Sequence, residues 1–423
     1  LRYSSLDNRD SNQRFVDARA RARASEGLGV EADVQVAQQN LDPLGPASTP
    51  DRPNLGANHV ETRLLQAAPY ARGERPGIAA YEAKAVASDL RSSGDALPTL
   101  RALEFDAALR SPYAGSLVRW KADARSFTVR PEGARALDDR RARATVAVRL
   151  PGELYVGAVL GYDATDFLGD ANRSGSARGV GLAWNPSPRT RATAVFEHRF
   201  YGPAHAVDIS WRTPRTAWRA ASVRDLTILP NVLTPGASSA PAALMGDLLA
   251  SAIADPEARA AAARRRLEES ALGGAAPLSS SFLGTRPVEY REDELAGAFI
   301  GPRDTLTLRA NRREQHARGP ALAPGTAAQF EQDVRQTRYS AQWAHRLTPL
   351  STLALEAAWL EARSLDDPLA RRSRQRQLTA RFNVRLGPRS TVAFGVRRAS
   401  FEGNAGFDTF GERAVFALFT AQL

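Results

Sequence analysis

The sequence contains no cysteine, which excludes disulfide frameworks, cysteine-ligated zinc, iron–sulfur clusters and thiol catalysis. Lysine is nearly absent: of the 57 basic residues only Lys84 and Lys121 are lysines, so arginine dominates the positive charge. No apolar run approaches the roughly 18 residues that a membrane-spanning helix needs. The longest, Leu154 to Leu160, has the length of a strand. The chain starts at Leu1 without methionine, so we expect a mature form or a fragment.

Motifs that carry catalysis or bind cofactors are also missing. There is no Gly-x-Ser-x-Gly elbow, no phosphate-binding loop that ends in Lys-Ser or Lys-Thr, and no His-x-x-x-His pair among the five histidines. The carboxylate pairs Asp138-Asp139 and Asp366-Asp367 fall in loops or at strand junctions. They either bind calcium or another cation that bridges lipids, or bind no ion. We therefore expect no catalytic residues, no cofactor and no metal site.

Period-two alternation recurs along the 423 residues in segments of about ten residues. The clearest case is Leu378, Ala380, Phe382 and Val384, which alternate with polar or charged residues from position 377 to 385. Similar alternation marks several other segments: Val16–Ala22, Val30–Val36, Leu103–Leu109, Val118–Ala124, Ala142–Val148, Leu154–Tyr162, Val180–Trp184, Ala192–Phe200, Val207–Trp211, Leu306–Ala310, Tyr339–Trp343, Leu353–Trp359, Val392–Val396 and Val415–Leu423. A helix would mix the two sets on every face, so the pattern predicts strands with one apolar and one polar face.

The connections between these strands alternate in length. Short turns, many with proline followed by Ser or Thr, occupy every second connection: 25–29, 111–115, 151–153, 185–190, 212–216, 301–305, 347–351 and 386–390. The intervening connections are longer and more polar, as in 39–57, 167–176, 317–333, 365–373 and 402–412; the short connection 202–204 is an exception. Short turns at one end and long loops at the other are typical of outer-membrane barrels.

These patterns predict an all-β protein that forms one transmembrane, antiparallel, up-and-down β-barrel over residues 1–423. The bilayer explains the strand length, because about 9 to 11 tilted residues cross the hydrocarbon core. A soluble propeller or solenoid is the alternative, but it would show a repeat of about 40 to 50 residues, and none is visible. The turns indicate about 20 strands, with 18 to 20 plausible. Leu1 to Ser5 would be the end of the first strand.

One segment, Leu226 to Thr285, lacks the period-two alternation and is predicted to be a long loop inserted in the barrel. Within it, Pro241 to Gly273 has helical character, and Asp255-Pro256-Glu257 is a typical helix start. The order of the strands places this insert on the outer side. It is either a plug or lid of the pore, or a surface excursion, and its residues do not decide between them.

Arginines fall on the polar face of many strands, interspersed with acids. Because guanidinium groups bind carboxylates and phosphates in bidentate fashion, arginines on a pore wall would favour anions. The alternative is that they only neutralise acids of the same lumen. Candidate contacts for a polymer or anion in the lumen are Arg119, Arg125, Arg309, Arg313, Arg338, Arg381, Arg385 and Arg397.

Nucleic-acid binding is a further hypothesis, because the isoelectric point is near 10.5. Proteins of that class usually cluster basic residues with exposed aromatics on one face. Here arginine is spread at strand spacing through the whole chain and is balanced by 46 acids. We therefore expect no nucleic-acid partner.

Three stretches carry a likeness to a known family: Gly179–Thr190, with the sequence GVGLAWNPSPRT; Phe196–Gly202; and Ile209–Trp218. They resemble the outer-membrane β-barrel family associated with the PEP-CTERM and exosortase system. His345–Thr352 and the hairpin Phe382–Phe394 fit as well. The resemblance implies the outer membrane of a Gram-negative bacterium and a link to exopolysaccharide synthesis and export, and it brings no catalytic residues. Such chains usually end in Phe or Trp, whereas this one ends in Leu423.

The sequence thus favours a porin that exports an anionic exopolysaccharide through an arginine-lined lumen. The alternative is a non-conducting structural barrel that anchors or partners an envelope or surface assembly. Expected partners are outer-membrane lipid and lipopolysaccharide, an acidic polysaccharide and a periplasmic export protein.

Overall fold

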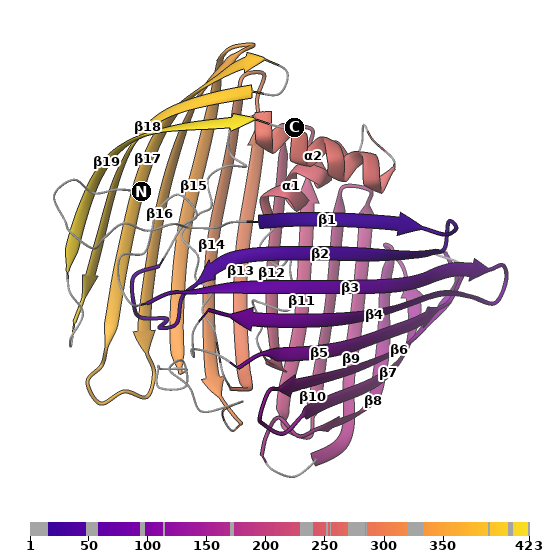
Figure 1. The fold of residues 1–423 in the computed structure, drawn as a ribbon. Coiled ribbons are helices and arrows are strands. Elements are labelled where there is room, and N and C mark those ends of the chain that lie inside the picture. Colours follow the sequence, from indigo (N-terminus) through magenta and orange to yellow (C-terminus); the bar gives the residue numbers. More distant parts are fainter. Residues whose placement is uncertain are drawn as a thin grey trace.

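The computed structural model describes residues 16–47, 58–93, 98–112, 115–169, 173–228, 240–250, 253, 255–269, 284, 286–319, 321, 333–387, 390–404 and 409–421. Nineteen strands form one sheet that curls around an interior (Figure 1). The first ten are β1 Val16–Arg23, β2 Leu28–Gln39, β3 Val60–Arg75, β4 Ala79–Ser92, β5 Leu100–Arg110, β6 Val118–Pro131, β7 Leu137–Leu150, β8 Leu154–Thr165, β9 Arg173–Ser187 and β10 Thr190–Arg199. The others are β11 Gly202–Arg212, β12 Thr216–Thr227, β13 Val288–Ile300, β14 Asp304–Ala317, β15 Val334–Thr348, β16 Ser351–Ser364, β17 Arg372–Gly387, β18 Ser390–Gly403 and β19 Phe410–Ala421.

Each strand pairs with the next one in the sequence, and all pairs are antiparallel, from β1 with β2 to β18 with β19. The prediction of an all-β, up-and-down fold with about 20 strands is confirmed. Within the described residues no register joins β19 to β1. The expected strand at Leu1 to Ser5 lies outside those residues. The alternation did not single out β3, β4, β12 and β13, because alanines occupy both faces of β3 and β4 and polar residues both faces of β12 and β13.

The connections define two ends of the wall. Short turns join β7 to β8 at 151–153, β13 to β14 at 301–303 and β15 to β16 at 349–350, and we call this the short-turn end. The opposite end carries the connections that follow even-numbered strands, and we call it the long-loop end. The exception found in the sequence also holds, since β10 and β11 are joined at the long-loop end by two residues only.

The sheet has two different faces. On β17, Leu378 and Phe382 are 57% and 39% exposed on the outer face, whereas Gln377, Thr379 and Arg381 are buried on the inner face. In water an exposed apolar band around the molecule would be unfavourable, but in a bilayer it faces lipid. Because each strand from β1 to β19 pairs with its neighbours in the sequence, the backbone groups between these strands need no water. The chain is therefore a transmembrane barrel of the outer-membrane type, and its residence is the outer membrane.

Two helices lie in the insert between β12 and β13: α1, Ala240–Leu249, and α2, Pro256–Glu269. Neither is long and apolar enough to span a membrane. The insert was expected on the outer side, and for the described helices that expectation is wrong. Leu244 and Met245 of α1 pack on Ala217, Ala298 and Ala344, which lie near the short-turn ends of β12, β13 and β15. The helices cross one end of the strands in Figure 1.

An apolar cluster fills the interior at the long-loop end of the first half of the sheet. Phe127 and Phe167 meet edge to face, with ring centroids 6.3 Å apart. They pack with inward side chains from β3 to β6 and from the end of β12, including Leu64, Leu90, Leu100, Val129 and Leu226. The interior is therefore apolar at this end and polar along most of its length.

Candidate functional site

The interior wall of β4 to β12 lines a cavity of about 720 Å³. Its inward side chains carry both signs of charge, and many of these charges lie close to an opposite one. Lys84 Nζ is 3.0 Å from Glu31, and an Arg125 Nη is 2.7 Å from Glu104. A polar interior of this kind is typical of porin-like barrels.

Toward the long-loop end, ion pairs bridge this cavity from β7 to strands farther along the sheet. Arg143 of β7 contacts Glu197 of β10 at 2.7 Å and Asp163 of β8 at 2.8 Å. Arg141 of β7 contacts Asp225 of β12 at 2.7 Å, with four strands between β7 and β12. These guanidinium groups therefore tie together parts of the wall that are not hydrogen-bonded neighbours.

The arginines predicted for the lumen all lie at inner-face positions of their strands, but most are engaged with the wall itself. Arg125, Arg309 and Arg397 each pair with a carboxylate of the adjacent strand: Glu104, Glu294 and Glu412 respectively. At these three positions arginine neutralises an acid of the same lumen, which is the alternative to anion binding.

The other five predicted arginines have different surroundings. Arg119 lies 3.8 Å from the ring centroid of Tyr155, and Arg313 lies 5.3 Å from that of Tyr290. Arg338 and Arg381 are buried on the inner wall of β15 and β17. Arg385 is exposed, near the short-turn end. The structure therefore does not bring the eight together as an open ring.

A segment predicted as outer loop lies inside the barrel. Residues 40–47 follow β2 and are almost entirely buried. The backbone N–H of Ala47 donates to Gln375 Oε1 at 2.9 Å, and Gln375 Nε2 donates to the Ala47 carbonyl at 3.3 Å. Ala47 also packs on Ala358 and Leu360 of β16. The segment thus covers the inner wall of β15 to β17, and we call it the inner segment.

The α1–α2 pair covers the inner wall at the short-turn end. Its contact surface on the strands is made largely of alanine: Ala217, Ala296, Ala298 and Ala344. Arg212 Nη1, at the end of β11, donates to the carbonyl of Asp247 at 2.9 Å. Many inner-wall positions elsewhere on these strands are polar or charged, whereas the positions where the helices dock are small and apolar.

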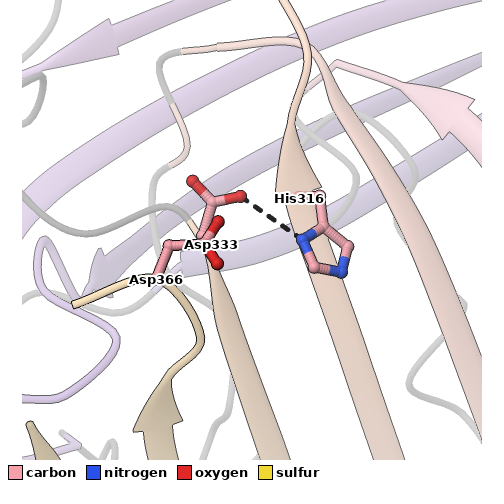
Figure 2. Close-up of side chains that lie close together, drawn as sticks. All are labelled: His316, Asp333 and Asp366. Atoms are coloured by element: carbon pink, nitrogen blue, oxygen red, sulfur yellow. Dashed lines mark ion pairs between the residues drawn. The ribbon is translucent and has the colours of Figure 1, made fainter. Parts of the chain in front are cut away.

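A group of possible metal ligands lies at the long-loop end, on the outer side of the wall. His316, Asp333 and Asp366 come from the end of β14, the start of β15 and the loop after β16, and Figure 2 shows them facing one another. Their ligand atoms lie within 4.8 Å of one another. Nitrogen and carboxylate oxygens form a ligand set that suits divalent ions such as Zn²⁺.

The same geometry has an explanation without an ion. His316 Nδ1 lies 3.5 Å from Asp333 Oδ1, and the N–H of Ala317 donates to that oxygen at 3.0 Å. These contacts join the ends of β14 and β15 by themselves. Of the three members, sequence analysis singled out only Asp366, in the Asp366-Asp367 pair, because His316 and Asp333 lie far from it along the chain and share no motif with it.

No family model matches this chain, and no curated protein matches it. Solved structures of outer-membrane proteins are similar to it along most of its length. They include the siderophore receptor PirA from Acinetobacter baumannii, with 8% identity, 95% of this chain and 69% of that chain covered, and a TM-score of 0.46. The copper transporter OprC has 9% identity, 96% and 77% coverage and a TM-score of 0.39. OccK8 (OprE) from Pseudomonas aeruginosa has 9% identity, 94% and 98% coverage and a TM-score of 0.37.

Proposed function

We propose that this chain is an outer-membrane porin that exports an anionic exopolysaccharide, and that the α1–α2 pair and the inner segment hold it closed between transport events. The observation that carries the proposal is the alanine surface on β12, β13 and β15 that receives α1. Contacts between alanine and a few larger apolar residues bury little area, so the helices can leave at a modest cost in free energy. A polar, charged wall would then line the passage.

The cargo class follows from the wall and from the resemblance to the PEP-CTERM-associated barrels. The chain has a net charge of +11, which favours an anionic polymer. Since most inner-wall arginines already contact acids or aromatic rings, each offers only weak binding to a passing polymer. Weak, repeated binding is what transport requires, because the polymer must leave as well as enter. We place the periplasmic export partner at the short-turn end, beside α1 and α2, and assign no catalytic role.

Planar-bilayer conductance tests this function. The two proteins compared are the full chain and a variant in which residues 240–269 are replaced by a short Gly-Ser linker. We expect rare, brief steps from the full chain and long-lived steps from the variant. Polygalacturonate on one side should block the variant's steps transiently, whereas neutral dextran of similar size should not.

A second candidate, the structural barrel, is favoured by the apolar cluster around Phe127 and Phe167, which fills one side of the interior. Silence of the linker variant, once it is shown to be folded and inserted by heat-modifiable electrophoretic mobility, would reject the porin and support this candidate. Equal block by dextran would keep the pore but reject an anionic cargo.

A further inference from the structure

The outer face of the wall carries a groove of about 530 Å³ that runs over β12 to β17. Its floor is formed by small side chains, and aromatic and aliphatic side chains stand on either side. At Gly297 a Cβ would lie 2.6 Å from the ring of Trp218, so the missing side chain lets this ring lie against the strand. Leu308 and Tyr339 are exposed on the same face. An acyl chain fits such a surface in size and in polarity.

Aromatic rings end the groove toward the long-loop end. The rings of Tyr339 and Trp359 lie 5.3 Å apart between centroids, and these two residues are directly paired on β15 and β16. Aromatic side chains at this depth are typical of the boundary between hydrocarbon and headgroups. Arg376 of β17 is the register partner of Trp359 and also lines the groove. The groove therefore ends in a guanidinium group at headgroup level.

Two more arginines continue outward from Arg376 on the same face of β17, at every second position. They are Arg374 and Arg372, and Arg372 is paired in register with Arg363 of β16. Arg374 lies 3.4 Å from Glu361. Among the described residues, no carboxylate lies within ion-pair distance of Arg372 or Arg376. The local excess of charge on this outer face is thus positive.

We propose that this surface binds a phosphorylated glycolipid of the outer leaflet. An acyl chain occupies the groove, and a phosphate of the sugar headgroup is bound by Arg376 and Arg374. Arginine suits this role because its planar guanidinium group donates two parallel hydrogen bonds to a phosphate. The long-loop end of an outer-membrane barrel faces the outer leaflet, which is where phosphorylated lipid A is found. The inference rests on the barrel's residence in the outer membrane and not on the exported cargo.

Native mass spectrometry of the purified full chain, released from detergent micelles, measures this binding. The probes are bisphosphorylated lipid A and enzymatically dephosphorylated lipid A. The triple variant R372Q/R374Q/R376Q removes the charges. A matched control, R101Q/R130Q/R140Q, removes three exposed arginines of β5 to β7, whose side chains also lie on the outer face near the long-loop end. We expect the first triple variant to bind lipid A at least tenfold more weakly, and the control to bind as the full chain does.

A separate change tests the groove without altering charge. Ala357→Phe fills the groove floor and should weaken binding of phosphorylated and dephosphorylated lipid A alike. Inorganic phosphate added in excess should displace neither lipid, because the acyl chain contributes to affinity. If the triple variant does not fold, lipid A binding is measured with R376Q instead. Unchanged lipid A binding by folded R376Q or triple variant would overturn the proposal, as would equal loss in the β5–β7 control or equal binding of phosphatidylglycerol.

Discussion

At the scale of single residues, the interior depends on charges that are removed from water in pairs. Arg143, Asp163 and Glu197 have side chains that are 8%, 1% and 6% exposed. A buried ion pair adds little net stability, but removal of one member leaves a buried charge without compensation. In the first half of the barrel, inner-face charges are therefore constrained by their partners more strongly than residues of the outer face are.

We expect Arg143→Ala to lower the free energy of unfolding by about 3 to 5 kcal/mol, because buried Asp163 loses its guanidinium partner and buried Glu197 keeps only Arg199. Urea unfolding in lipid vesicles, followed by tryptophan fluorescence, measures the change. Arg219→Ala is the control: its partner Asp208 lies within reach on β11, but both side chains are more than a third exposed. For that exposed pair we expect a loss of less than about 1 kcal/mol. Equal losses in both variants would contradict this assignment.

The sequence predicted which way the lumen arginines point, but not what they contact. Alternation fixes the face of a strand, and Arg309 and Arg381 lie on the predicted face. Partners such as Glu197 for Arg143 are 54 positions away and depend on how sharply the wall curves. No local pattern encodes that curvature.

At the scale of elements, side chains of two strands anchor the inner segment. Gln336 of β15 donates to the Pro43 carbonyl at 3.4 Å, and Gln375 of β17 makes the closer contacts. Gln375 exchanges two hydrogen bonds with the backbone of Ala47. Gln375→Leu has a similar volume and cannot make them, so the backbone groups of a buried residue are left without partners, at a cost of about 1 to 3 kcal/mol each. We expect faster proteolytic cleavage between residues 40 and 47.

Cleavage at this segment, read by mass spectrometry of limited digests, should rise at least severalfold in the variant. Gln342→Leu is the matched control, since it changes a buried inner-wall glutamine of β15. If both variants are cut at the same increased rate, the effect would be a general loosening of the wall rather than loss of the anchor.

The α1–α2 pair depends on contacts at the centre of its docking surface. Met245 is fully buried, against Ala344 of β15 and Ala263 of α2. Met245→Glu places a charge in this contact, where no basic partner is available in the apolar cluster, so the helices should undock. In planar bilayers we expect the open fraction to rise at least tenfold.

Ala258→Glu changes charge equally on an exposed position of α2 and should leave the open fraction as it is in the full chain. An equal rise in both variants would mean that the added charge, and not the docking contact, alters conductance.

For α1 and α2, the sequence predicted that helices form but not where they lie in the barrel. Asp255 begins α2 as expected, with its carboxylate accepting a hydrogen bond from the N–H of Ala258. The position of the helices at the short-turn end could not be predicted, because a helix can run back through the interior from a loop at the other end. For residues 40–47, Leu41 and Leu44 were an available signal, since apolar residues are unusual in exposed loops.

At the scale of the whole molecule, conductance should depend on pH through the docked helices. Burial raises the pKa of the Asp247 carboxyl group, and nearby Arg212, Arg219 and Arg259 offset this only in part. A carboxyl whose pKa is raised on docking favours the docked state when protonated. That contribution is complete below the ordinary pKa of aspartate, about 3.9, and is lost as pH rises through the raised value.

The full chain should therefore open more often at neutral than at acidic pH in planar bilayers. Asp247→Asn keeps the side chain neutral, so this variant should stay closed at neutral pH and lose most of the pH dependence. A variant that follows the same pH profile as the full chain would show that another group controls it.

The barrel itself was predictable because lipid imposes a strict pattern on every strand. Lipid requires apolar side chains on the outer face, such as Leu378 and Phe382. The inner face carries polar ones, such as Thr379 and Arg381. Strand number and connection lengths follow from the same repeat. The positions of the segments inside the barrel do not follow from this repeat, because they depend on contacts between residues far apart in the sequence.

The inner segment also bears on the order of folding. Every strand pairs with its neighbours in the sequence, so the wall can grow hairpin by hairpin with a small loss of loop entropy. The hydrogen bonds between Ala47 and Gln375 instead join residues 328 positions apart. They cannot form until β16 and β17 are in place, so the segment docks late, and its docking marks a nearly finished wall. A chain interrupted before β17 would leave this part of its interior uncovered.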